Sequence, residues 1–273
     1  MSEHLKAQGR CQSAHVLTEC RAGLVSAVFE HVAGGDLAQR MSSMRRNGES
    51  FEPPVVAWLM REMLSGLAYL HGQRVMHRDL KPANLLVTGP PSWRLIITDF
   101  GLARRLEPPP LATEGAVVTL WYRAPELLLG VPTHTTAIDM WAAGCILGEL
   151  LTPTLSPLFP GREDRSEMLQ REQILCVARL LGPPTAEEWP ALETLRLWST
   201  VRRWPELAQP RRASLKDTLT KVLTGEESQQ KKTSPPPSAA ALALLCRLLS
   251  YDPERRPSAE AALADDYLRD AQL

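Results

Sequence analysis

The pattern of hydrophobic and polar positions predicts both strands and helices in the first half of the chain. The apolar, β-branched stretch "GLVSAVFEHV" (23–32) predicts a strand, and "AGGDL" after it predicts a turn that leads into a helix capped by Asp36. "PPVVAWLMREMLSGLAYLHG" (53–72) opens on prolines, keeps helical apolar spacing and ends on glycine, which predicts a long buried helix. Two short apolar runs at 84–87 and 94–98 predict strands joined by a proline-containing turn.

The second half of the chain predicts helices and two irregular segments. The stretch "MWAAGCILGELL" after Asp139 is apolar nearly all round, which predicts a central helix buried on every side. Further helices are predicted at 166–181 and 238–250, with a polar, mobile linker at 224–238. Residues 99–126 lack periodicity and predict a long loop, a feature that is usually functional in a compact domain.

Composition and charge are those of an ordinary globular protein. Lys+Arg and Asp+Glu both number 31, so neither direct nucleic-acid binding nor an anionic membrane partner is expected. The five cysteines show no CxxC spacing, which favours buried free thiols and a reducing compartment. The N-terminus has no signal-peptide core, and no run approaches about 18 uninterrupted apolar residues, so a soluble intracellular protein is expected.

The stretch "VMHRDLKPANLLV" (75–87) and the later "DFG" contain groups suited to phosphoryl transfer. That reaction needs Mg²⁺ to neutralise phosphate oxygens, a carboxylate to orient the attacking hydroxyl, and a cation at the transferred group. Asp79 would orient the hydroxyl, and Lys81 would contact the γ-phosphate from the same side. Asn84 and Asp99 offer oxygen ligands of the kind that Mg²⁺ prefers. The alternative role for Asp79 is that of a helix-capping or turn residue.

Three motifs together, "HRDLKPAN", "DFG" and "APE" (124–126), resemble the signature of protein kinases. Each motif alone is weak, but their order and spacing make coincidence unlikely. The resemblance implies an α+β, protein-kinase-like fold: mainly the helical C-lobe, with a remnant of the N-lobe β-sheet. It also implies ATP and Mg²⁺ as cofactors, a buried ion pair between Glu126 and Arg256 that anchors the activation segment, and a bracing role for Asp139 beneath the catalytic loop.

The stretches "VVTLWYRAPELLLG" (117–130) and 158–190 resemble the cyclin-dependent kinase family, and look most like its Mediator-associated members. This resemblance implies a catalytic role for Thr119. It also implies that Arg123 engages the loop around Val118 and shapes a pocket for proline, so that the substrates would be proteins with Ser/Thr-Pro sites. The alternative for Arg123 is a surface salt bridge. One departure is "DFG", whose middle residue is methionine in animal members of that subfamily.

The same resemblance bears on regulation. Glu114 falls where many cyclin-dependent kinases carry an activating phosphothreonine. A fixed negative charge there would meet Arg78 and Arg104 without phosphorylation. Thr113 is adjacent, and a shift of register by one residue would make it the corresponding position.

The strand at 23–32 resembles the last N-lobe strand plus the hinge of the kinase family. The resemblance implies that Phe29 is the gatekeeper, that Glu30 and Val32 border the adenine, that Asp36 lies near the ribose, and that Leu86 forms the floor under the base. For Phe29, ordinary strand packing is an equal alternative.

Upstream of this strand the kinase pattern is incomplete. The 273 residues contain no GxGxxG, and Lys6 lacks the apolar strand context of the family's ATP-binding lysine. We therefore expect a weakly patterned segment at 1–22, a truncated kinase domain at 23–273, and weak activity. A cyclin partner is possible, although its recognition helix is missing, and analogy favours the nucleus. Two functions remain open: a serine/threonine kinase, or an inactive kinase-lobe fragment that acts as a protein-binding module.

Overall fold

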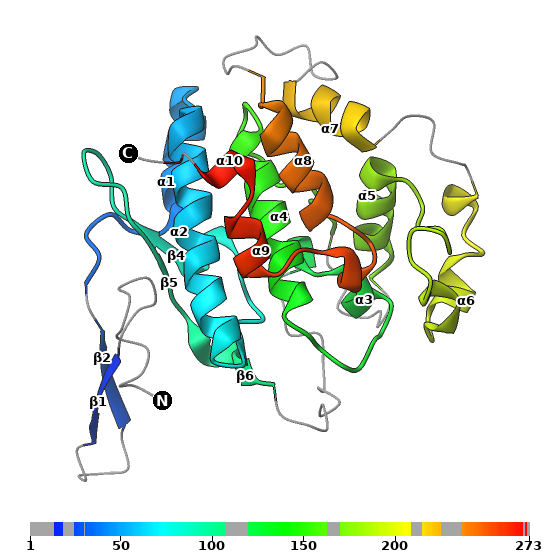
Figure 1. Cartoon of the computed structure of the whole chain (residues 1–273), viewed down its shortest axis with the longest axis horizontal. Coiled ribbons are helices and arrows are strands. Elements are labelled where there is room, and N and C mark those ends of the chain that lie inside the picture. Colours follow the sequence, from blue (N-terminus) through cyan, green and yellow to red (C-terminus); the bar gives the residue numbers. More distant parts are fainter. Residues whose placement is uncertain are drawn as a thin grey trace.

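The computed structural model describes residues 14–18, 25–29, 31–106, 120–162, 170–208, 215–224, 236–269 and 271. Helices make up most of this part of the chain (Figure 1). Their bounds are α1 Leu37–Asn47, α2 Pro53–Gly72, α3 Pro125–Leu128, α4 Ala137–Leu151, α5 Arg171–Leu181, α6 Trp198–Val201, α7 Leu215–Thr224, α8 Ala239–Leu248, α9 Ala259–Leu263 and α10 Asp266–Arg269. The strands are β1 Ala14–Thr18, β2 Val25–Phe29, β3 Val75–Met76, β4 Leu85–Val87, β5 Leu95–Ile97 and β6 Arg104–Arg105.

Two buried helices form the centre of the helical body. Figure 1 shows α4 (green) between α2 (cyan) and α8 (orange). All of α4 from Ile138 to Leu150 is buried, as its nearly uniform apolar sequence predicts. The prolines that open α2 occupy its first turn, where a missing N–H costs no hydrogen bond, and the helix has the predicted bounds 53–72.

The strands form three antiparallel pairs: β1 with β2, β3 with β6, and β4 with β5. The pair β4–β5 is the predicted hairpin, with Leu85 opposite Ile97 and a turn through "TGPPSW". The pairing of β3 with β6 joins the two ends of the stretch that carries the catalytic motifs. The α+β fold class expected from the sequence is confirmed.

Some elements differ from the sequence-based expectation. Strand β1 lies at 14–18, where no element was predicted, and pairs with β2 over its whole length. Helix α7 was not predicted either; Leu215, Leu219 and Leu223 recur every fourth residue, and the latter two are buried. Helix α8 begins after Ser238, whose hydroxyl accepts a hydrogen bond from the Ala241 N–H at 3.1 Å, close to the predicted start. Of the predicted linker, residues 225–235 lie outside the described part.

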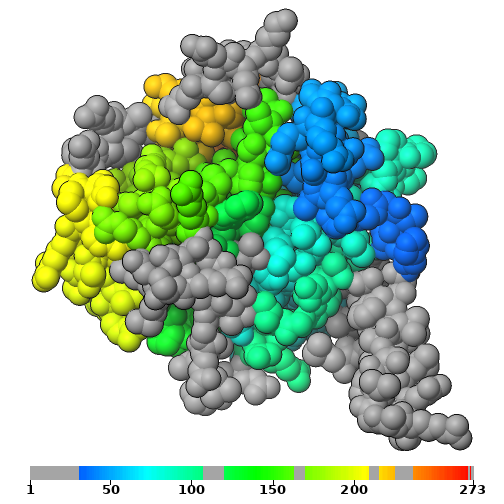
Figure 2. Space-filling model, turned by 180° about the vertical axis from the view of Figure 1, so that it is seen from behind, coloured from blue at the N-terminus to red at the C-terminus, as the bar shows by residue number. Residues whose placement is uncertain are grey.

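The opposite face of the molecule brings together segments that are distant in sequence. Figure 2 shows the cyan and teal atoms of the β3–β6 region beside the green atoms of residues 120–160, with α1 (blue) next to them. Within the described residues, no helix has the length and apolarity needed to cross a membrane.

Candidate active site

The buried carboxylate of Asp139 on α4 fixes the backbone just ahead of Asp79. Asp139 is 1% exposed, and its two oxygens accept the backbone N–H groups of His77 at 2.9 Å and Arg78 at 2.8 Å. His71 Nε2 lies 2.9 Å from the Asp139 Oδ2 atom. Burial by itself would raise the pKa of Asp139. The hydrogen bond and charge of His71, then the charge of His77 and the hydrogen bond from the Arg78 backbone, outweigh burial and hold the pKa below its usual value. Asp139 therefore lies against the backbone of His77 and Arg78, directly before Asp79.

The structure brings Asp79, Lys81 and Asn84 together in one cluster. Lys81 Nζ lies 2.7 Å from Asp79 Oδ2, so the two side chains face the same side. Asn84 Nδ2 donates to the backbone carbonyl of Asp79 at 2.8 Å and to its Oδ2 atom at 3.0 Å. The Asp79 carboxylate therefore accepts hydrogen bonds from both Lys81 and Asn84 on its Oδ2 atom.

Asp99 follows β5 and connects to the same cluster through its neighbour. The N–H of Thr98 donates to the Asn84 carbonyl at 3.0 Å, which places Asp99 one residue beyond that link. Asp99 is exposed and has a left-handed backbone, with φ 60°. Its carboxylate accepts the Gly101 N–H at 3.3 Å. The left-handed φ angle belongs to Asp99 itself. Its exposed carboxylate is available to a cation.

The segment that would border the nucleotide is pinned to β4. The Val87 N–H donates to the Gly35 carbonyl at 2.9 Å, and Asp36 forms an isolated antiparallel bridge with Leu86. Asp36 also caps α1, since its side chain accepts the Gln39 N–H at 2.8 Å. Asp36 and Leu86, the predicted ribose and adenine-floor residues, are therefore neighbours.

Position 34, in the segment that passes β4 before α1, requires glycine. A Cβ atom added to Gly34 would lie 1.8 Å from the Val87 carbonyl oxygen, so only glycine allows the chain to pass so close to β4. Val32 is partly buried two residues earlier. Phe29 ends β2, where only the backbone is described, and Glu30 lies outside the described residues.

Arg78 and Arg104 lie close enough to affect each other. Burial, and after it the positive charge of Arg104, lower the pKa of Arg78, while Asp139 opposes this shift. Arg78 is 3% exposed, and among the described residues its Nε atom has no hydrogen-bond partner. Such a crowded pair of cations favours a negatively charged group. The remaining residues predicted for this segment, Thr113, Glu114, Val118 and Thr119, lie outside the described part of the chain.

Arg123 is 6% exposed, so its side chain does not form an ion pair at the surface. Its neighbour Tyr122 makes a contact that the sequence did not predict. The Tyr122 hydroxyl donates to Glu149 Oε2 at 2.7 Å, and Glu149 is 4% exposed on α4. Burial raises the pKa of Glu149 to about 7, although Tyr122 and the charge of Arg45 lower it in part. The signal in the sequence was an acidic residue inside an otherwise apolar helix.

We expect Glu149 to make stability depend on pH. Its carboxyl is protonated in the folded protein and ionised in the unfolded chain between pH 4.5 and about 7, so the free energy of unfolding falls as pH rises through this window. The loss amounts to at most about 3 kcal/mol. His134, whose pKa is lowered to about 4, acts in the opposite direction between pH 4 and 6.5, so the wild-type curve alone does not isolate the effect.

The measurement is urea unfolding at pH 5 and pH 7.5 for the wild type and Glu149→Gln. The variant lacks the acidic group. Between pH 5 and pH 7.5 its free energy of unfolding should therefore fall by about 2–3 kcal/mol less than that of the wild type. Glu260→Gln, on an exposed position of α9, is the matched control and should follow the wild type. Parallel pH profiles for wild type and Glu149→Gln would contradict the prediction.

Glu126 and Arg256 form a buried bidentate ion pair. Arg256 Nη1 and Nη2 each lie 2.7 Å from one oxygen of the Glu126 carboxylate. The same guanidinium donates to the carbonyls of Ser250, Ala137 and Tyr251, at 2.8, 3.0 and 3.0 Å. The pair ties α3, whose first two residues are the last two of "WYRAPE" (121–126), to α4 and to the segment before α9.

The residues present fit Mg²⁺ and ATP by their donor chemistry. Asn84 has its NH₂ group engaged, which leaves its amide oxygen for a cation, and Asp99 adds an exposed carboxylate. One carboxylate and one amide oxygen form a hard-oxygen donor set of the kind that Mg²⁺ uses beside phosphate. Lys81 supplies the nearby positive charge.

Comparison with known proteins agrees with this geometry. Residues 16–268 match the protein kinase domain family. The chain belongs to the protein kinase family. Among its relatives, Probable cyclin-dependent kinase 8 of Dictyostelium discoideum is 36% identical over 260 residues, which cover 92% of this chain and 62% of that protein. Serine/threonine-protein kinase srb10 of Schizosaccharomyces pombe is 39% identical over 250 residues, covering 88% of this chain and 63% of the relative.

Cyclin-dependent kinase B2-1 of Arabidopsis thaliana is 35% identical over 243 residues, covering 89% of this kinase chain and 68% of that protein. The predicted resemblance to cyclin-dependent kinases is thereby confirmed. The chain spans less than two-thirds of the length of the first two relatives.

Proposed function

We propose that this chain is a serine/threonine protein kinase of the cyclin-dependent type, which transfers the γ-phosphate of ATP to Ser or Thr followed by Pro. The observation that carries the proposal is the cluster of Asp79, Lys81 and Asn84, with its 2.7 Å contact between lysine and carboxylate. A structural aspartate in a turn would need neither a lysine nor an asparagine on the same oxygen. The cluster suits a reaction in which a hydroxyl must be oriented next to a transferring phosphoryl group.

Each residue of the cluster has one task in this proposal. Asp79 accepts the proton of the substrate hydroxyl and orients its oxygen for attack. Lys81 neutralises charge on the transferred group, and Asn84 and Asp99 hold the metal. Mg²⁺, when bound, supplies positive charge to the phosphate oxygens. Thr119 would complete the catalytic residues.

The activation segment would be organised by charge. Arg78 and Arg104 form a cationic pair; burial, and after it the charge of Arg104, lower the pKa of Arg78. Glu114 would supply the fixed negative charge that this pair favours, with Thr113 as the alternative. Arg123 would shape the pocket for proline together with Val118.

We also propose a cyclin partner and a nuclear location. The support is the names of the relatives, which include cyclin-dependent kinases. The substrates proposed are proteins, not nucleic acids, because positive and negative side chains balance at 31 each.

Substrate class is tested with four matched peptides that carry Ser-Pro, Ser-Ala, Thr-Pro or Tyr-Pro at one position. We expect transfer from radiolabelled ATP to the Ser-Pro and Thr-Pro peptides at least about tenfold faster than to Ser-Ala, and none to Tyr-Pro. Arg123→Lys should narrow the ratio of Ser-Pro to Ser-Ala, because a lysine cannot reproduce the planar contacts of arginine. Equal rates for Ser-Pro and Ser-Ala would contradict the proline pocket.

A protein-binding module is the second candidate. The observation that favours it is the lack of a GxGxxG in these 273 residues, a motif that in kinases covers the ATP phosphates. This reading predicts no transfer to any of the four peptides, together with binding of a protein partner that is unaffected by Asp79→Asn.

A further inference from the structure

His71, in the last turn of α2, contacts the carboxylate that holds the backbone ahead of Asp79. Helix α2 (cyan) lies beside α4 (green) in Figure 1, so His71 from one helix meets Asp139 from the other. His71 Nε2 lies 2.9 Å from Asp139 Oδ2, and the two side chains are 11% and 1% exposed. The pKa of Asp139 is held below its usual value, so its carboxylate is ionised near neutral pH and can only accept hydrogen bonds. The Nε2 atom of His71 therefore carries the hydrogen of this contact.

Three donors are shared between the two oxygens of Asp139. Its Oδ1 atom accepts the N–H of Arg78 at 2.8 Å, and Oδ2 accepts the N–H of His77 at 2.9 Å together with the His71 side chain. The two amides belong to one segment of backbone, whereas the imidazole approaches from α2. Without the imidazole the carboxylate would be held from one direction only, and its plane would be free to turn.

The backbone that Asp139 holds has a conformation that needs support. Arg78 is left-handed, with φ 71°, a conformation that residues other than glycine adopt rarely. Such a conformation persists where surrounding contacts hold it, and here the Arg78 N–H is bound to Asp139 Oδ1. The next residue is Asp79, whose N–H donates to His77 Nδ1 at 3.3 Å. A turn of the Asp139 carboxylate is therefore passed directly to the backbone of Asp79.

We propose that His71 is a positioning residue for the proposed phosphoryl transfer. Its Nε2–H group keeps the Asp139 carboxylate turned so that both oxygens hold the backbone at His77 and Arg78, and this backbone places Asp79. His71 acts through Asp139 and takes no part in the transfer of the proton or the phosphoryl group. The effect on the rate rests on the proposed kinase function, whereas the effect on the backbone does not and is measured separately.

Three variants of His71 separate the hydrogen bond from simple packing. In His71→Gln the amide nitrogen is as many bonds from Cα as Nε2 is in histidine, so it can donate to Asp139. In His71→Asn the side chain is shorter by a methylene group, so the same amide does not reach the carboxylate. His71→Leu fills the space and offers no donor.

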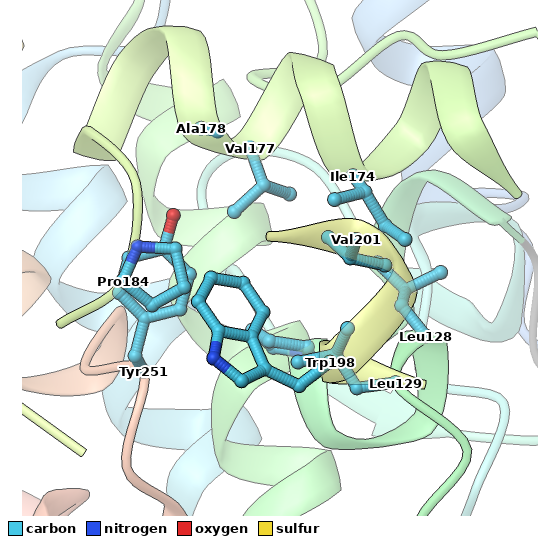
Figure 3. Close-up of a pocket in the computed structure, with 10 residues that line it drawn as sticks. Leu128, Leu129, Ile174, Val177, Ala178, Pro184, Trp198, Val201 and Tyr251 are labelled. Carbon is cyan, nitrogen blue, oxygen red and sulfur yellow. The ribbon is translucent and has the colours of Figure 1, made fainter. Parts of the chain in front are cut away.

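The kinetic test is transfer of phosphate to the Ser-Pro peptide over a range of ATP concentrations. We expect kcat to fall about 10- to 100-fold in His71→Asn and His71→Leu, with the KM for ATP within about twofold of the wild type. His71→Gln should recover most of the lost rate. The control is Ile174→Val, which removes one methylene group from the wall of the apolar pocket in Figure 3, away from this network, and should keep the wild-type kcat.

Backbone amide exchange tests the positioning without any activity. The amides of His77 and Arg78 should exchange at least about tenfold faster in His71→Asn and His71→Leu, and within about threefold of the wild-type rate in His71→Gln. Each rate is divided by that of the amides of Leu244 and Leu245, buried in α8, to correct for a change in global stability.

Two results would overturn the proposal: wild-type exchange ratios in His71→Asn, or equal losses in His71→Gln and His71→Asn. If His71→Leu does not fold, the pair of amide variants still gives this comparison. If the wild type transfers no phosphate, the proposed kinase function fails, and the exchange ratios alone then decide whether His71 positions this backbone.

Discussion

Replacement of Arg256 by Ala is expected to lower the free energy of unfolding by about 3–5 kcal/mol. The Arg256 side chain is 0% exposed and makes two 2.7 Å bonds to Glu126, whose side chain is 4% exposed. Without the guanidinium, the carboxylate stays buried with no counter-charge. The carbonyls of Ser250, Ala137 and Tyr251 also lose a donor, which adds to the cost.

Urea unfolding of the wild type and Arg256→Ala measures this loss. The control is Arg202→Ala, which breaks an ion pair of similar length, 2.8 Å to Glu193, between side chains 52% and 56% exposed. Water screens that pair, so its removal should cost less than about 1 kcal/mol. Arg256→Lys should fall between the two, because it keeps the charge and loses the bidentate geometry. A loss at Arg256→Ala no larger than that of the exposed control would contradict the role of the buried pair.

Long, strongly patterned elements could be predicted from the sequence, and short or marginal ones could not. Helix α2 has an apolar face, prolines at its start and a glycine at its end, and all three signals agree. Helix α7 carries only two buried leucines, so its period was too weak to stand out beside the polar linker. Strand β1 forms through its pairing with β2, and the residues of β1 alone do not predict that pairing.

The sequence motifs name the members of the candidate site but not its geometry. The motifs name Asp79, Asn84 and Asp99, but periodicity could not place the Asp139 carboxylate against the amides of His77 and Arg78, 62 and 61 residues away. That contact depends on how α4 packs inside the helical body. The carboxyl of Glu149 was missed for a related reason, since its partner Tyr122 ends a short 3-10 helix 27 residues earlier. Long-range polar contacts follow from the fold and are visible only in it.

Loss of the Asp79 carboxylate is expected to reduce phosphoryl transfer by about 10²- to 10⁴-fold. Asparagine has nearly the same shape, so it can keep a contact with Lys81, now 2.7 Å from the aspartate, but it cannot accept the proton of the attacking hydroxyl. The backbone around position 79 is held by Asp139 and not by the Asp79 side chain, so Asp79→Asn should fold as the wild type does. The effect should therefore appear in the rate and not in the melting temperature.

The matched control is Asp266→Asn, the same chemical change at a side chain that is 78% exposed in the ion pair with Arg269. It removes one carboxylate from the surface and touches nothing in the catalytic cluster. Its rate of transfer should equal that of the wild type.

The measurement that tests the kinase assignment most directly is transfer of label from [γ-³²P]ATP to a Ser-Pro peptide by the full 273-residue chain, with and without Mg²⁺. The account predicts Mg²⁺-dependent labelling of serine by the wild type and Asp266→Asn, slow because the glycine loop is missing, and a loss of at least about a hundredfold in Asp79→Asn. Labelling that is the same in Asp79→Asn as in the wild type, or absent from all three proteins, would contradict the assignment of Asp79 as the catalytic base.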